Sequence, residues 1–179
     1  MTTTNKTSVL LQQDKKLFHT KDLALLWKIN HPPTLRTTIS RYIKNGTLIP
    51  IQRGFYSTVP LEKLDPLDLG SSAIHQFCYL STESVLFQAG IINQPSPAIT
   101  FCSSQSKNFS LVGHHFRSRQ LRPLHLYNPI GILSQNHYKI ASPERAAADL
   151  LYYNSSYYLD APELLNQELF AEIKQKVYA

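Results

Sequence analysis

Apolar residues recur at helical spacing in the first part of the chain. They predict a first helix over residues 7–17 and a second over residues 21–28, with Thr20 as the N-cap of the second. Two prolines interrupt this pattern, and a third helix is predicted behind them, over residues 33–45, because proline fits the first turn of a helix. Gly46 follows as a C-cap residue, so three helices are expected before the first strand.

Two short runs rich in β-forming residues come next, residues 47–51 and 55–59. Arg53 and Gly54 lie between them, which predicts a β-hairpin with a tight turn. Pro50 has no backbone N–H to donate, so its strand is expected at a sheet edge. Helices followed by a hairpin are in the order of a winged helix-turn-helix, which we predict for residues 1–60.

The predicted third helix has two different faces. At about 100° per residue, its apolar side chains gather in one stripe, formed by Leu35, Ile39, Tyr42 and Ile43. Hydroxyl groups and cations occupy the other side, and no Asp or Glu accompanies them. An ordinary solvated helix mixes both signs of charge, so this face is a candidate binding surface.

Charge strengthens that interpretation. The chain of 179 residues carries 18 Lys and Arg against 12 Asp and Glu, a formal net charge of +6. Nine of the cations but only two of the acids lie in residues 1–60, so this part has a net charge of +7 and the remainder −1. Such asymmetry indicates a polyanionic partner for the N-terminal part. With 42% hydrophobic residues, the chain as a whole is predicted to fold.

The candidate DNA contacts are Thr34, Arg36, Thr37, Ser40, Arg41 and Lys44 on the third helix, Arg53 at the hairpin turn and Lys28 at the end of the second helix. We expect Arg36 and Arg41 to bond base edges, because a guanidinium matches O6 and N7 of guanine. Lys44, Lys28 and Arg53 are expected to contact phosphates, which position a protein without reading sequence. A winged helix that binds a protein partner, with its basic face merely solvated, is the alternative.

The second half is predicted to be a mixed α+β domain over residues 67–179, behind a linker at 61–66. Its expected helices cover residues 67–77, a segment from Ser81 as N-cap to Gly90, residues 143–153 behind Ser142, and residues 160–177. Its expected strands cover residues 98–102, 109–116, 121–127 and 138–140. The predicted fold class of the whole chain is therefore α+β.

Catalytic chemistry is sparse in this second half. Cys78 and Cys102 have neither metal-ligand spacing nor nearby paired histidines, and His114 and His115 would face opposite sides of a strand. Residues 98–140 contain no Asp or Glu, which disfavours a metal-dependent nuclease. We therefore expect no enzyme, no metal and no cofactor.

Two surface groups leave alternatives open. The cluster of Arg117, Arg119 and Arg122 is either a second phosphate contact or a set of solvated strand ends. Four tyrosines crowd residues 152–158, and they fit either a homodimer contact or packing between helices of one chain.

The sequence also bears on location. No apolar run approaches the roughly 18 residues of a membrane-spanning helix, and no apolar signal segment follows the N-terminus. The chain is expected to be cytoplasmic, with no membrane contact.

Four segments resemble AbiEi-type antitoxins of type IV toxin–antitoxin systems. They are LFHTKDLALL with LRTTISRYIKNGTLIPIQRGFYS in the N-terminal part, then YLSTESVLFQAGI at 79–91 and YKIASPERAAADLL at 138–151. Their order along the chain is that of the family, and the resemblance extends over about residues 17–153.

The resemblance implies a DNA-binding repressor that autoregulates its operon at operator repeats and counters a nucleotidyltransferase-like toxin. It also implies that the third helix and the wing contact DNA, which applies here to Arg36, Thr37, Ser40, Arg41, Lys44 and Arg53. This chain is shorter than some family members, so the neutralising role of its second half is not implied as firmly. A protein-interaction module without DNA affinity and a metal-dependent nuclease are the alternatives.

Overall fold

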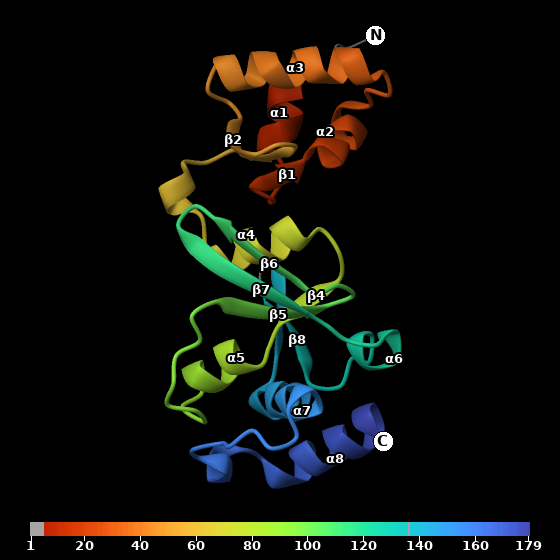
Figure 1. Cartoon of the computed structure of the whole chain (residues 1–179). Coiled ribbons are helices and arrows are strands. Elements are labelled where there is room, and N and C mark those ends of the chain that lie inside the picture. The colour runs from red at the N-terminus through yellow and green to blue at the C-terminus, as the bar shows by residue number, and fades with distance from the viewer. Residues whose placement is uncertain (1–5, 136) are drawn as a thin grey trace. The chain divides into compact units, whose positions relative to one another are not determined.

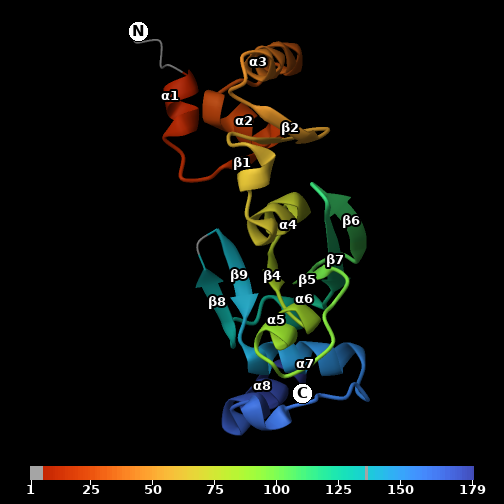
Figure 2. The same ribbon diagram turned by 90° about the vertical axis from the view of Figure 1, so that its left-hand side faces the viewer.

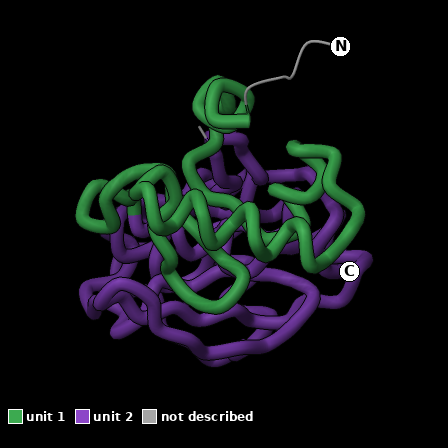
Figure 3. The backbone as a smooth tube through the Cα atoms, turned by 90° about the horizontal axis from the view of Figure 1, so that it is seen from above, with its two compact units in different colours: residues 1–65 green, residues 66–179 purple. Residues whose placement is uncertain are grey.

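The computed structural model of the chain describes residues 6–135 and 137–179. The chain forms two compact units, Met1–Asp65 and Pro66–Ala179, whose boundary lies at the end of the predicted linker (Figure 3). Both units combine helices and strands, and the fold class is α+β, as predicted. Within the described residues, no helix has the length and apolar character that crossing a bilayer requires.

Unit 1 combines helices with short strands (Figure 1). Its elements are α1 (Lys6–Leu11), β1 (Leu17–His19), α2 (Thr20–Trp27), α3 (Pro32–Lys44), β2 (Ile49–Gln52) and β3 (Phe55–Ser57), before a 3₁₀ turn at Leu61–Lys63. The strands form an antiparallel sheet in the order β1-β3-β2. The predicted third helix and hairpin are confirmed, and Pro50 lies in an edge strand, as its missing N–H requires.

The first predicted helix is wrong in its second half. Helix α1 ends at Leu11, because residues 12–16 are all polar and exposed and offer nothing to bury. Leu17 and Phe18 instead pair with β3 and are buried there. Thr20 is the first residue of α2 rather than its N-cap. The N-cap is His19, whose N–H donates to the Asp22 carboxylate at 2.9 Å.

Helix α3 is held by its apolar stripe. Leu35, Ile39 and Tyr42 are buried in one cluster with residues of α1 and α2. The Tyr42 ring lies 4.9 Å from the Trp27 ring, and its hydroxyl is 3.1 Å from the Thr7 hydroxyl. These contacts fix the rotation of α3 about its own axis, because turning it would expose the stripe.

Unit 2 is built on a six-stranded mixed sheet (Figures 1 and 2). Its helices are α4 (Pro66–Ile74), α5 (Glu83–Gln88), α6 (Pro123–Leu126), α7 (Pro143–Tyr153) and α8 (Gln167–Tyr178), with a 3₁₀ turn at Pro162–Leu164. Its strands are β4 (Cys78–Leu80), β5 (Ile99–Ser103), β6 (Lys107–Leu111), β7 (His114–Gln120), β8 (Ile132–Gln135) and β9 (Tyr138–Ala141). They are arranged in the order β6-β7-β5-β4-β9-β8.

Helices cover both faces of this sheet. Phe101 and Phe116 face α4, which comes so close that a Cβ on Gly70 would lie 2.6 Å from the Phe116 ring. The next residue of β5, Cys102, points the other way, as successive strand residues do, and its thiol lies 3.7 Å from the Asp149 carboxylate on α7. Helix α8 packs on α7, on the side away from the sheet (Figure 2).

Two predicted strands of unit 2 are wrong. The segment predicted as one strand over residues 109–116 turns back on itself at Val112 and Gly113, both with positive φ, as a two-residue hairpin turn requires. Valine rarely adopts that conformation, so the sequence signalled the turn weakly. The segment 121–127 contains α6, which begins at Pro123, a residue suited to a first helical turn.

Other elements differ in their limits. Helix α4 ends at Ile74 instead of residue 77, and the short strands β4 and β8 were not predicted. Thr82, not Ser81, is the N-cap of α5. The predicted last helix is a 3₁₀ turn followed by α8, which begins behind Asn166 because that side chain accepts the Leu169 N–H. The predicted α7, with Ser142 as N-cap, is confirmed.

A buried ion pair joins these elements. Arg145 and Asp149 of α7 are fully buried, and the Arg145 Nε donates to Asp149 Oδ1 at 2.8 Å. The remaining guanidinium donors bond the Tyr79 hydroxyl at 3.0 Å and the carbonyl oxygens of His125, Asn128 and Ile130 at 2.6, 3.1 and 2.9 Å. Ser81 donates to the other carboxylate oxygen at 2.6 Å. The Arg145 side chain therefore links α7 to β4 and to the segment that leads from α6 to β8.

Burial and the Asp149 carboxylate together shift the pKa values of the neighbouring side chains. Burial alone would lower the pKa of the Arg145 guanidinium, but the adjacent carboxylate holds this pKa above its ordinary value. Burial raises the pKa of Tyr79 and of Tyr178, and the charge of Asp149 raises both further. The Arg145 guanidinium therefore stays charged and the two tyrosine hydroxyls stay neutral at physiological pH.

We expect Gly70→Ala to destabilise unit 2 by about 1–3 kcal/mol, because the added methyl group would collide with the buried Phe116 ring. Thermal unfolding followed by circular dichroism measures the change. Helix propensity alone favours alanine over glycine by about 1 kcal/mol, so a more stable variant would contradict the packing described for α4.

We expect Asp149→Ala to destabilise unit 2 by about 3–5 kcal/mol, because it leaves the Arg145 guanidinium buried without its counter-ion. Glu172→Ala is the matched control. It breaks an ion pair of the same i,i+4 spacing with Lys176, but on an exposed helix face, and should change stability by less than about 0.5 kcal/mol. Equal effects of the two substitutions in urea unfolding would refute the role assigned to Asp149.

Candidate nucleic-acid interface

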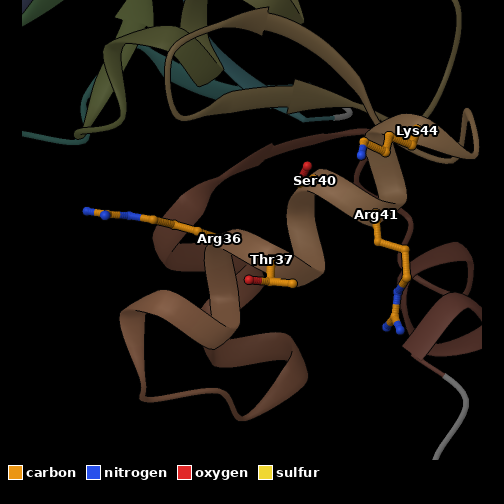
Figure 4. Close-up of a pocket in the computed structure, with 5 residues that line it drawn as sticks. All are labelled: Arg36, Thr37, Ser40, Arg41 and Lys44. Carbon is orange, nitrogen blue, oxygen red and sulfur yellow. The ribbon is translucent and has the colours of Figure 1, made fainter.

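The exposed face of α3 gathers five of the predicted DNA contacts. Burial of the apolar stripe directs the opposite side of the helix to solvent. A shallow hollow of about 490 Å³ lies there, lined by Arg36, Thr37, Ser40, Arg41 and Lys44 (Figure 4). All five side chains are exposed. The structure therefore brings these predicted residues together on one helix face.

The side chains of this face point in different directions. Figure 4 shows the two arginine heads directed away from each other, with Thr37 and Ser40 between them and the ammonium end of Lys44 toward Ser40. The Arg41 guanidinium lies 6.0 Å from the centre of the Tyr42 ring, at the flank of the helix. The Thr37 hydroxyl donates within the helix, to the Pro33 carbonyl oxygen at 3.1 Å.

Acids do not neutralise this face. Residues 32–44 contain no Asp or Glu. One of the two acids in residues 1–60, Asp22, is engaged elsewhere, since its carboxylate accepts from Lys15 Nζ at 2.8 Å and from the His19 N–H. The other, Asp14, is exposed in the segment between α1 and β1. The three cations of α3 therefore create a positive potential that attracts anions.

Three predicted contacts lie outside the hollow. Thr34 is exposed in the first turn of α3, where its hydroxyl is 3.0 Å from the Nδ1 of His31. Lys28 is exposed behind α2 as its C-cap. Arg53 is exposed in the hairpin turn, and this turn is held against α2 because the Gly54 carbonyl accepts the Thr20 N–H at 2.9 Å. Each remains available to a phosphate.

The arginines of unit 2 differ among themselves. Arg119 forms an ion pair with Glu83, and its guanidinium lies 5.2 Å from the centre of the Tyr153 ring. Arg117 lies on the same strand and is half-buried, whereas Arg122 is exposed as the N-cap of α6. The predicted cluster is therefore not uniform, since Glu83 already partners one of its three cations.

The cysteines and histidines do not form a site. Burial raises the pKa of the Cys78 thiol to about 11, although a hydrogen bond to Ser71 opposes the shift. Cys102 is fully buried and its pKa is also raised, so both thiols stay protonated at neutral pH. Within residues 6–135 and 137–179, no three His, Cys, Asp or Glu side chains are grouped in a way that would hold a metal ion.

The tyrosine-rich segment is largely engaged within unit 2. The Tyr152 ring packs against His125 and Tyr178, with ring centres 5.0 and 5.1 Å away. Tyr153 donates its hydroxyl hydrogen to the Gln120 carbonyl oxygen at 2.9 Å. Tyr158 is 78% exposed. Packing within one chain accounts for the first two, and the predicted homodimer contact stays a prediction.

Comparisons with known proteins bear on the fold. No protein-family model matches the chain, and no curated protein matches its sequence. Among solved structures, the chain is similar to the crystal structure of the RV2827C protein from Mycobacterium tuberculosis, with a TM-score of 0.54. The match covers 94% of this chain and 69% of that chain at 12% sequence identity. At this identity the similarity concerns the fold alone.

Proposed function

We propose that this chain is a DNA-binding regulator that places the exposed face of α3 in the major groove of a duplex. The observation that carries the proposal is the composition of that face: three cations, three hydroxyl side chains counting Thr34, and no carboxylate, on a helix whose other side is buried. Cations neutralise phosphates, and hydroxyl groups bond phosphates or base edges, so the face has the donors that a duplex requires.

The surrounding elements support the same proposal. The order α1, α2, α3 and then the β2–β3 hairpin is the one that winged helix-turn-helix proteins use. In that arrangement the third helix enters the groove and the hairpin tip reaches the neighbouring backbone. Arg53 occupies that tip here, and Lys28 at the end of α2 supplies a further cation for a phosphate.

The biological role that fits is transcriptional repression within a type IV toxin–antitoxin system. The support is the resemblance of four segments to AbiEi-type antitoxins, which extends into unit 2 through residues 79–91 and 138–151. On this proposal the chain acts in the cytoplasm, binds operator DNA near its own gene and opposes a nucleotidyltransferase-like toxin. Inverted repeats in the operator would require two protomers, hence the proposed homodimer.

We expect the affinity for duplex DNA to fall steeply with salt. If about four cations each neutralise one phosphate, log K changes with log salt concentration by about −3.6, so binding weakens roughly 150-fold between about 50 and 200 mM salt. Fluorescence anisotropy with a labelled duplex from the region upstream of the gene measures this slope. A slope near zero would be incompatible with phosphate contacts.

Reversing two charges on α3 should weaken binding to all duplexes. For Arg41→Glu combined with Lys44→Glu we expect an affinity loss of more than about tenfold and a smaller salt slope than in the wild type. The matched control is Lys174→Glu with Lys176→Glu, which makes the same charge change on the exposed side of α8. Equal losses for both pairs would mean that net charge, not the α3 face, drives binding. A chain that binds no duplex but co-purifies with a neighbouring gene product would favour a protein-interaction module.

A further inference from the structure

The rotation of α3 about its own axis determines how directly each of its exposed side chains faces outward. The stripe of Leu35, Ile39 and Tyr42 defines the inward direction. At about 100° per residue, Lys44 and Thr37 lie within about 15° of the opposite, outward direction, and Ser40 about 45° from it. We call Thr37, Ser40 and Lys44 the outward line of α3.

The two arginines flank this line. By the same geometry Arg36 lies about 85° to one side of the outward direction and Arg41 about 55° to the other, so they are about 140° apart around the helix. Their heads follow that divergence and point away from each other (Figure 4). Arg41 lies only about 10° further from the outward direction than Ser40, and its head makes the difference, because the guanidinium lies beside the Tyr42 ring at the flank of the helix.

A major groove has walls as well as a floor. An α-helix with its side chains is about 10–12 Å across, and the groove is about 12 Å wide, so a helix that enters it lies close to both sugar–phosphate strands. Side chains in the outward direction meet the base edges on the floor, and side chains on the flanks meet the strands on either side.

We infer that Arg36 and Arg41 clamp the phosphates of the two opposite strands, while the outward line of Thr37, Ser40 and Lys44 meets the base edges and carries the sequence preference. The inference rests on the proposed function. It exchanges the roles that the sequence suggested, in which Arg36 and Arg41 read bases and Lys44 contacts phosphate. It also names the substrate more closely, as a B-form duplex read in its major groove by small side chains and one lysine.

The chemistry of the outward line narrows the sequence that it prefers. Because the Thr37 hydroxyl hydrogen is used inside the helix, this residue offers a methyl group and oxygen lone pairs, which suit a thymine methyl or a base amino group. Lys44 is the long donor of the line, and its ammonium suits O6 and N7 of guanine. The short Thr37 and Ser40 side chains let the helix backbone approach the floor, so that both strands come within reach of the arginines.

The test places the same new side chain at the two kinds of position. Glutamine bonds the N6 and N7 of adenine when it reaches the groove floor. Full-length wild type, Thr37→Gln and Arg41→Gln are each incubated with a pool of random-sequence duplexes at low salt, and the retained duplexes are sequenced. Matched thermal unfolding of the three proteins checks that the exposed substitutions leave the fold intact.

The inference predicts opposite outcomes for the two variants. Thr37→Gln should enrich adenine at one position of the retained sequences by about tenfold relative to wild type. Arg41→Gln should leave the retained sequences as in the wild type, weaken binding to all of them alike and reduce the salt slope by about 1.

The remaining outcomes separate this inference from the proposed function. If Arg41→Gln changes the preferred sequence, or if Thr37→Gln leaves it unchanged, the assignment of roles is overturned, whereas DNA binding by the chain stands. If the wild type retains no duplex from the pool, the proposed function is overturned, and the assignment with it.

Discussion

The apolar side of α3 packs into the core of unit 1, and this packing determines what the opposite side offers to solvent. Leu35, Ile39 and Tyr42 are buried against α1 and α2, and the Tyr42 hydroxyl and carbonyl groups are both hydrogen-bonded. A helix held in this way cannot rotate without exposing its stripe. The fold therefore exposes the cations of α3, and their positions follow from the burial of the residues on the opposite side of the helix.

Unit 2 depends on a different interaction. The Arg145–Asp149 pair is buried beneath the sheet, where an unpaired charge would be severely unfavourable. Hydroxyl and carbonyl groups around the pair form hydrogen bonds with both charged side chains. The pair also brings together two segments that are distant in the sequence, 79–81 and 145–149. Tyr79 and Ser81 belong to or follow β4, and Arg145 and Asp149 belong to α7, so these polar side chains hold the fold together.

Local sequence signals were sufficient to predict α3, α7 and the hairpin, because each signal agrees with the tertiary structure. The signals are an apolar stripe for α3, a Ser-Pro helix start for α7 and an Arg53-Gly54 turn for the hairpin. The same reasoning failed where tertiary pairing decided the outcome. Leu17 and Phe18 continue a helical pattern but pair with β3. Val112 stands in a turn that only Gly113 signals. The buried ion pair of α7 was not predicted, since burial cannot be read from spacing alone. The five-residue face of α3 was predicted completely, whereas the directions of the Arg36 and Arg41 heads required coordinates.

That divergence also bears on which kind of partner α3 fits. Two cations about 140° apart around a helix cannot both rest on a flat protein surface, because the contact of one lifts the other away. The walls of a major groove rise on both sides of a helix and carry phosphates along their whole length, so both cations find an anion at once. A flat protein partner would need large side chains to fill the hollow between the two arginines, whereas base edges can contact the short Thr37 and Ser40 side chains there. The arrangement of the cations around α3, more than their number, therefore favours a duplex as the partner.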